Sequence, residues 1–114
     1  MLRYNLYLND ILRAIKKIEF SIKNKDENSF CKDVDLIDAT SMRIQVIGES
    51  INKIPLKIRN NFKKVEWGKF LRARNIISHA YFAVNPKIIW SIAKEEIPRL
   101  KKSILKIKGE IDDK

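Results

Sequence analysis

The spacing of the apolar residues is what most narrows the folds open to this chain. Over residues 8–22 the apolar side chains recur in steps of three and four, at Leu8, Ile11, Ile15, Ile18 and Ile22. Such steps place the side chains on one stripe of an α-helix, whereas a half-buried strand would alternate in steps of two. The same rhythm returns over residues 34–54 and after Pro86. The pattern predicts an all-α protein.

Helix-starting residues divide this pattern into segments. Pro55 can open a short helix, and Asn85 followed by Pro86 is a favourable cap and first-turn pair for a last helix, which Pro98 should kink or divide. We expect four main helices and one short one, at about residues 8–22, 34–54, 55–62, 66 to 79–81, and from 86 onward. At 114 residues they should form one domain over residues 1–114, an antiparallel bundle with a frayed tail at 109–114.

Two details of this plan carry further expectations. Gly48 lies inside the second helix, where glycine costs about 1 kcal/mol relative to alanine, so we expect another backbone to approach closely there. Residues 24–33 are interpreted as a polar connection, with Cys31 half-buried in it.

The chain has a large excess of positive charge. Its 24 Lys and Arg against 14 Asp and Glu give a net charge of +10, which favours nucleic acid, an acidic partner or an anionic membrane surface, although a lysine-rich genome produces the same excess. The densest run has only Glu66 opposing it: Lys53, Lys57, Arg59, Lys63, Lys64, Lys69, Arg72 and Arg74. We take Lys63, Lys64, Lys69 and Arg72 as RNA-binding candidates, with a solvated helical face as the alternative. A second group is expected to face solvent: Arg99, Lys101, Lys102, Lys106 and Lys108.

Several classes of site lack their residues. Cys31 is the only cysteine, and no GxxxxGK loop, HExxH pair or CxxC occurs, so no cofactor or metal is expected. Asp33, Asp35 and Asp38 are interpreted as an acidic first turn of a helix rather than as a metal site. No run of about 18 apolar residues is present, so we expect a soluble, cytoplasmic protein without a membrane partner.

The remaining reactive groups cluster in the stretch RARNIISHAYF: Arg74, Asn75, Ser78, His79 and Tyr81. Histidine exchanges protons near neutral pH, and the forked guanidinium of arginine fits phosphate oxygens. Together they suit metal-free cleavage of RNA, in which a base activates the ribose 2′-hydroxyl, a cation stabilises the phosphorane and an acid protonates the leaving oxygen. Since each chain has one histidine, either water fills one role or two chains bring two His79 residues to one site.

Spacing limits how these residues meet. Five residues along a helix rotate about 140°, so Arg74 and His79 do not stack, whereas Asn75 could orient the imidazole from position i−4. The alternative is structural. His79 would then be a hydrogen-bonded helix residue, and Arg74 the buried arm of a salt bridge to Glu49.

The same residues resemble a known family. RNIISHAYF looks like the Rx4HxY motif of the HepT toxins, a branch of the HEPN superfamily, and four other segments agree in order: NDILRAIKKI, DATSMRIQVIGES, Trp67 with Gly68, and FAVNPKIIW with EEIPRL. The likeness runs from about Asn9 to Leu100. The lead-in WGKFLRARN departs slightly from the commoner Gly, Met, Arg, Asn form.

The resemblance implies a HEPN-like helical homodimer with a composite, metal-independent endoribonuclease site. Arg74 and His79 would be catalytic, Asn75 and Ser78 supporting. Tyr81 would be AMPylated by the partner antitoxin, an MntA-like minimal nucleotidyltransferase, and the added charge would repel RNA. Two alternatives stay open: a non-catalytic helical module that binds the nucleotidyltransferase, and a basic protein that binds nucleic acid by charge alone.

Overall fold

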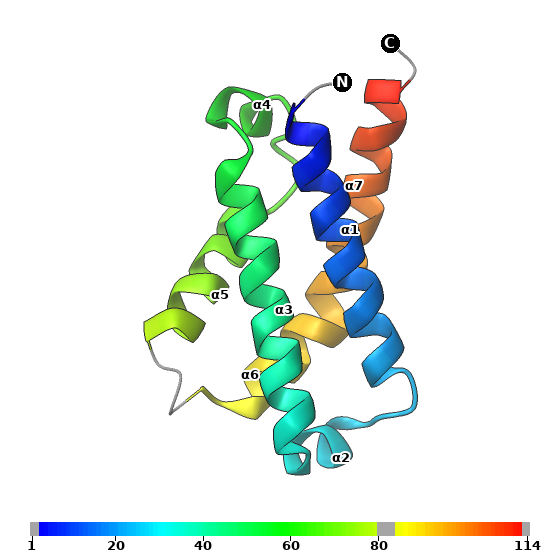
Figure 1. Cartoon of the computed structure of the whole chain (residues 1–114), viewed down its shortest axis with the longest axis vertical. Helices are drawn as coiled ribbons and strands as arrows, with labels where there is room; N and C mark the ends of the chain where they lie inside the picture. The colour runs from blue at the N-terminus through cyan, green and yellow to red at the C-terminus, as the bar shows by residue number, and fades with distance from the viewer. Residues whose placement is uncertain (1–2, 80–83, 113–114) are drawn as a thin grey trace.

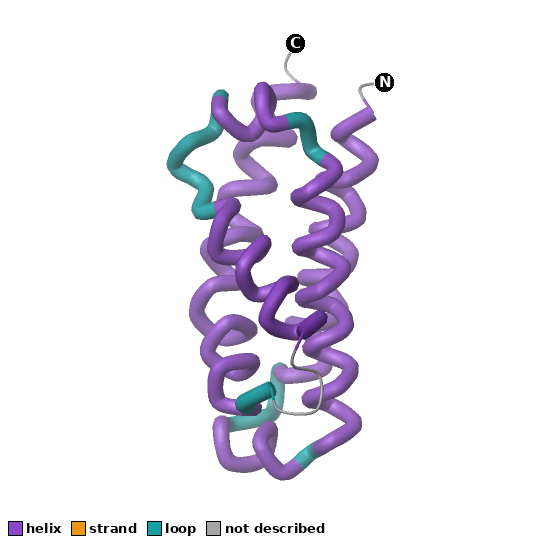
Figure 2. Tube along the Cα trace, turned by 90° about the vertical axis from the view of Figure 1, so that its left-hand side faces the viewer, coloured by secondary structure: helices purple, strands orange, loops and turns teal. Residues whose placement is uncertain are grey.

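The computed structural model describes residues 3–79 and 84–112, and helix is the only regular structure in this part of the chain (Figures 1 and 2). In order, the elements are α1 (Arg3–Ile22), α2 (Glu27–Lys32), α3 (Val34–Lys53), α4 (Leu56–Asn60), α5 (Trp67–His79), α6 (Pro86–Ser91), the π-helical η1 (Ile92–Glu96) and α7 (Ile97–Asp112). The all-α prediction is therefore confirmed. Tyr81, the residue expected to be modified, lies outside the described residues.

The long segments form an elongated bundle of 46 × 29 × 22 Å. α3 lies between α1 and α5, and α7 packs against α1 (Figure 1). Successive long segments run in opposite directions, so α1 begins and α7 ends at the same end of the bundle. Two of the short helices close the ends, with α4 at the upper end in Figure 1 and α2 at the lower.

The core is formed by the stripes that the spacing predicts. The five apolar residues of the first stripe, Leu8 to Ile22, are all at most 6% exposed. Buried isoleucines of α3 face them, and α7 adds Ile97, Leu100, Ile104 and Ile107. Steps of three and four thus mark the buried face of α1 and of the second half of α3. At the start of α3 the pattern fails, because Val34 is 66% exposed and Leu36 is buried instead.

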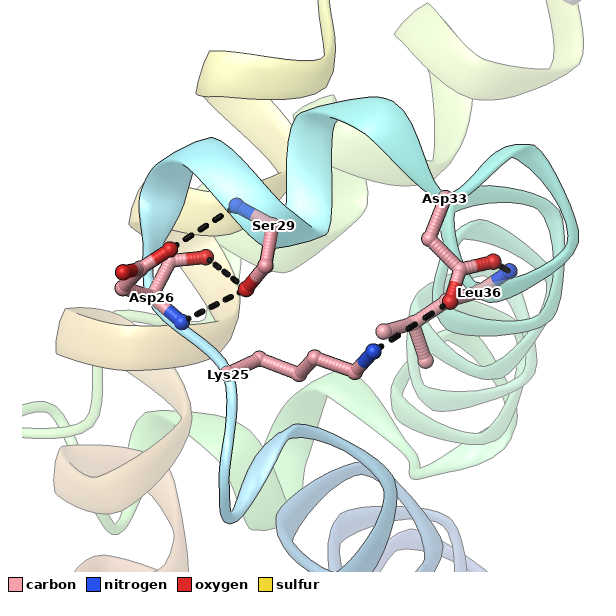
Figure 3. Close-up of polar contacts among 5 residues, drawn as sticks. All are labelled: Lys25, Asp26, Ser29, Asp33 and Leu36. Carbon is pink, nitrogen blue, oxygen red and sulfur yellow. Dashed lines mark hydrogen bonds and ion pairs between the residues drawn. The ribbon is translucent and has the colours of Figure 1, made fainter.

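Helix α2 lies where we expected only a polar connection. Asp26 caps it, accepting a hydrogen bond from the backbone N–H of Ser29, while the backbone N–H of Asp26 donates to the Ser29 hydroxyl (Figure 3). These contacts with Ser29 lower the pKa of Asp26. Phe30 is fully buried, and its ring lies 5.3 Å from that of Trp90. The expectation was wrong because a capping box and one buried aromatic suffice for a helix of six residues. Cys31 beside Phe30 is half-buried, as predicted.

An acidic residue at the start of α3 stabilises the helix. The Asp33 carboxylate accepts from the backbone N–H of Leu36 as the N-cap and lies 3.5 Å from the ammonium of Lys25 (Figure 3). This agrees with an acidic first turn.

As predicted, the regular α-helix is interrupted beside Pro98. Immediately before it the chain widens into η1, where the N–H of Ile97 donates to the carbonyl of Ile92, and α7 then continues. A π turn absorbs the change of hydrogen-bond register next to a residue without an N–H. α7 also reaches Asp112, further than expected, and Ile111 packs against the core. No helix of the described residues is long and apolar enough to cross a membrane.

Candidate active site

Helix α5 carries the candidate residues, and its first residue anchors it. The indole N–H of Trp67 donates to the carbonyls of Arg59 and Phe62, at 3.2 Å each, and the side chain is 8% exposed. Phe70, Ala73 and Ile77 continue the buried face along the helix. The anchor ties the start of α5 to the end of α4 and sets the rotation of the helix against α3.

Gly48 allows α3 and α5 to approach closely, as the sequence predicts. A Cβ at this position would lie 3.0 Å from the carbonyl oxygen of Phe70 and from Cγ of Arg74, and closer still to Cβ of Arg74. Only a glycine therefore leaves room for Arg74 to cross α3 at this level.

Arg74 is held on both sides of its guanidinium. Its Nε donates to Oε1 of Glu49 at 2.7 Å, and Nη2 lies 2.6 Å from the same oxygen. Its Nη1 donates to Oδ1 of Asn75 at 2.9 Å. The ion pair to Glu49 is present, but it is not buried, because the two side chains are 32% and 42% exposed. An ion pair this exposed contributes at most about 1 kcal/mol to folding, so its main effect is on the position of the guanidinium.

A second polar link lies one helical turn further along. The amide Nε2 of Gln45 donates to the hydroxyl of Ser78 at 3.0 Å. Gln45 and Glu49 are four residues apart on α3, and so are Arg74 and Ser78 on α5. The role of Gln45 was missed, although the matching four-residue spacing on either side of Gly48 is a signal that could have found it.

His79 is the last residue of α5, and its side chain is exposed. In the described part of the chain it makes no hydrogen bond, so the expected orientation by Asn75 is wrong for this structure. The Asn75 oxygen is bound to Arg74 instead, because a guanidinium is the stronger donor and lies next to it. The imidazole is thus open to a ligand or to another chain.

One exposed stripe of α5 leads to His79. Gly68, Arg72, Asn75 and His79 are separated by four, three and four residues, so they share one face of the helix. The guanidinium of Arg72 lies over Gly68, where a Cβ would come within 3.0 Å of it. The stripe is about 16 Å long, from the helical rise per residue.

The other cations of the run differ in their surroundings. Lys63 and Lys64 are exposed in the turn before α5. Lys69 lies 2.6 Å from Glu66 and 3.2 Å from Glu96, and the hydrogen bonds to these carboxylates raise the pKa of Lys69. Of the four RNA-binding candidates, Lys69 is therefore the one already neutralised within the protein. No group of three or more potential metal-binding side chains gathers among the described residues.

Comparison with known proteins points to one family. Residues 11–107 match the family described as "Ribonuclease HepT-like". A protein of Thermococcus cleftensis named "Probable ribonuclease HepT" is 31% identical over 102 residues, which cover 90% of this chain and 93% of that protein. A protein of Caldanaerobacter subterraneus named "Putative RNase" is 33% identical over 101 residues, covering 89% and 90%.

A longer relative from Methanocaldococcus jannaschii is named "Gamma-glutamylcyclotransferase and putative RNase". It is 39% identical over 107 residues, which are 94% of this chain. This chain spans about half of that relative, 48% of its length. No solved structure matches the chain significantly.

Proposed function

The chain belongs to the Ribonuclease HepT-like family, and from that premise we propose that it is a metal-independent endoribonuclease whose reactive groups are Arg74 and His79. The observation that carries the proposal is the end of α5, where a guanidinium held by Glu49 and Asn75 precedes an exposed imidazole by five residues. A cation and a proton-exchanging group at one exposed helix end are what metal-free phosphodiester cleavage needs.

In the proposed reaction a base removes the proton of a ribose 2′-hydroxyl, and the oxygen attacks the adjacent phosphorus. The P–O5′ bond breaks, a 2′,3′-cyclic phosphate forms, and an acid protonates the leaving 5′-oxygen. His79 serves as one of these two groups. Arg74 stabilises the phosphorane, since Nη1 and Nη2 each keep an N–H beyond the contacts to Asn75 and Glu49.

The second proton-exchanging group comes, in this proposal, from His79 of a second copy of the chain. Beside the site, α3 exposes two apolar side chains one turn apart, Met42 at 63% and Val46 at 40%. Glu49 continues the same face of α3 toward Arg74. A homodimer formed through this face would cover the apolar pair and bring two copies of the end of α5 together.

We further propose that the ribonuclease is the toxin of a cytoplasmic toxin–antitoxin pair. Its antitoxin would be an MntA-like nucleotidyltransferase that transfers AMP from ATP to the hydroxyl of Tyr81 and releases pyrophosphate. Tyr81 follows the site by two residues, so the added phosphodiester charge would repel RNA from His79. Mass spectrometry of the chain purified with and without its partner tests this part.

The proposed activity is tested by cleavage of single-stranded RNA in the presence of a chelator, with wild-type protein and His79→Ala. We expect the rate of RNA cleavage by His79→Ala to be at least about 100-fold lower than that of wild type, since acid–base catalysis usually contributes this much. Because the His79 side chain is exposed, the melting temperature should not change. Equal cleavage by both proteins, or none by either, would overturn the ribonuclease proposal.

One observation favours a second candidate, a non-catalytic helical module that binds a nucleotidyltransferase. Arg74 and Ser78 both link α5 to α3, as structural residues would. If this candidate is correct, neither wild-type protein nor His79→Ala cleaves RNA. Arg74→Ala then lowers the melting temperature and weakens binding of the partner.

A further inference from the structure

A large groove lies at the far end of the molecule from His79. It runs between the turn at residues 61–65 and the part of α7 from Arg99 to Glu110, and its volume is about 720 Å³. Phe62, Val65 and Ile107 supply its apolar lining, of which Phe62 is half-buried and the other two are at most 9% exposed. Phe62 is therefore the residue of this floor on which a flat ring could stack.

Cations line both sides of this groove. Lys63 and Lys64 project from the turn, and Arg99, Lys102 and Lys106 from α7; the one carboxylate among the described lining residues is that of Glu110. Among the described residues, none of the four lysines has an ion-pair partner, and Arg99 has only a distant one, 3.7 Å from Glu96. The groove therefore has unneutralised positive charge above an apolar floor.

The structure divides the basic residues of α7 into two groups with different roles. Lys101 pairs with Glu19 of α1 at 3.0 Å, and Lys108 donates to Asn5 of α1 at 2.7 Å. Arg99, Lys102 and Lys106 recur in steps of three and four on the other side of the helix, facing the groove. The expectation that this whole cluster faces solvent is wrong, because α7 packs one of its basic sides against α1.

The groove continues toward His79. A second hollow of about 450 Å³ adjoins it, shares Asn60, Lys63 and Val65, and is lined further by Gly68 and Arg72. Gly68 and Arg72 begin the exposed stripe of α5 that ends at His79. The two hollows thus adjoin one another from α7 across the turn to Arg72, with Glu66 as the carboxylate of the second hollow. Beyond Arg72 the exposed stripe of α5 goes on through Asn75 to His79.

We propose that this groove is a binding site for single-stranded RNA, separate from the reacting groups, which holds one or more nucleobases on its apolar floor and the phosphates on its lysines. Aromatic surface with flanking cations is how proteins bind single strands without reading their sequence. Continuity with the α5 stripe favours RNA over an acidic protein, because only a strand that ends at His79 would need the whole path. The proposal adds a substrate-holding region to the ribonuclease function and rests on it.

The test measures binding separately from cleavage. The probe is a fluorescently labelled single-stranded RNA with 2′-O-methyl riboses, which lacks the hydroxyl needed for the reaction and so cannot be cleaved. Fluorescence anisotropy gives the Kd for wild-type protein and for K102E/K106E. We expect the Kd of K102E/K106E to be at least about tenfold higher, from the loss of two phosphate contacts and the added repulsion.

A matched control makes the same change in net charge at another place in the molecule. K23E/K32E replaces two exposed lysines, one just after α1 and one at the end of α2. Its Kd should stay within about twofold of wild type, since α2 and α4 lie at opposite ends of the bundle and the groove begins at the turn after α4. Equal loss of affinity in both double variants, or no loss in K102E/K106E, would overturn the proposal. Phe62→Leu keeps the floor apolar, and a several-fold weaker binding of the same probe supports stacking there.

The RNA-binding proposal and the ribonuclease proposal can be refuted separately. If His79→Ala leaves RNA cleavage unchanged while K102E/K106E binds the uncleavable probe more weakly, the ribonuclease proposal is wrong and the RNA-binding proposal is supported. If the groove serves cleavage, K102E/K106E should raise KM for a long RNA and leave a trinucleotide unaffected, because the trinucleotide cannot reach from His79 to the groove.

Discussion

The contact between α3 and α5 and the groove beside α7 both gather polar and charged side chains, but they are held in opposite ways. In the first, Gly48 brings two helices close, and the side chains of Gln45, Glu49 and Arg74 each have a hydrogen-bond partner on the other helix. In the second, four lysines stand without ion-pair partners in the described structure. The closed contact fixes the position of a few groups, as the proposed chemistry requires, while the open groove leaves its charge available for the proposed RNA ligand.

The largest effect should come from filling the space at Gly48. Gly48→Ala places a methyl group against Arg74 and the carbonyl of Phe70, so the free energy of unfolding should fall by about 1–3 kcal/mol. Gly109 is the matched control, because a Cβ there meets nothing within 4 Å, and Gly109→Ala should gain up to about 1 kcal/mol from helix propensity. Urea denaturation measures both. If the free energy of unfolding changed in the same direction in both variants, the close approach of α3 and α5 would not be required.

A smaller effect, on activity rather than stability, is expected at Glu49. Glu49→Gln keeps the shape of the side chain but weakens its hold on Arg74, so kcat/KM for RNA should fall about tenfold, equivalent to about 1.4 kcal/mol. Stability should change by less than about 1 kcal/mol, because the pair is partly exposed. Glu19→Gln breaks a comparably exposed pair, with Lys101, and should leave activity unchanged. Similar activity in both variants would show that Glu49 does not position Arg74 for the reaction.

The smallest expected effect concerns the groove end of α5. The hydrogen bond with Lys69 lowers the pKa of Glu66 below 4.5 and raises that of Lys69 above 10.5. The pair therefore stabilises the fold between these values, and the contribution is lost as the pH falls below 4.5 or rises above 10.5. Lys69→Met should flatten the pH dependence of the melting temperature at both limits. An unchanged profile would show that this exposed pair does not contribute.

The α3–α5 contact was largely predictable from local spacing. Gly48 in a helix indicated a close approach, and the RNIISHAYF stretch indicated which helix carries the proposed reactive groups. Asn75 was assigned to His79 from its i+4 spacing, but the neighbouring guanidinium of Arg74 binds it instead. Spacing shows which side chains can meet and does not rank competing donors.

The groove was not predictable in the same way. Lys63 and Lys102 are far apart in the sequence, and only the packing of α7 against α1 shows which of its lysines turn toward the 61–65 turn. α2 was missed for a related reason, because its stability depends on Phe30 meeting Trp90, a contact across 60 residues of chain. Long-range packing decided both.

The central claim is that two chains contribute His79 to one site, and mixing wild-type and His79→Ala chains tests it most directly. A fixed amount of wild-type protein is allowed to exchange subunits with increasing His79→Ala protein, and exchange is verified by pull-down of a tag on one chain. If each site needs two His79 residues, RNA cleavage per wild-type chain falls in proportion to the fraction of wild-type chains. Cleavage per wild-type chain that stays constant at every ratio would contradict the account.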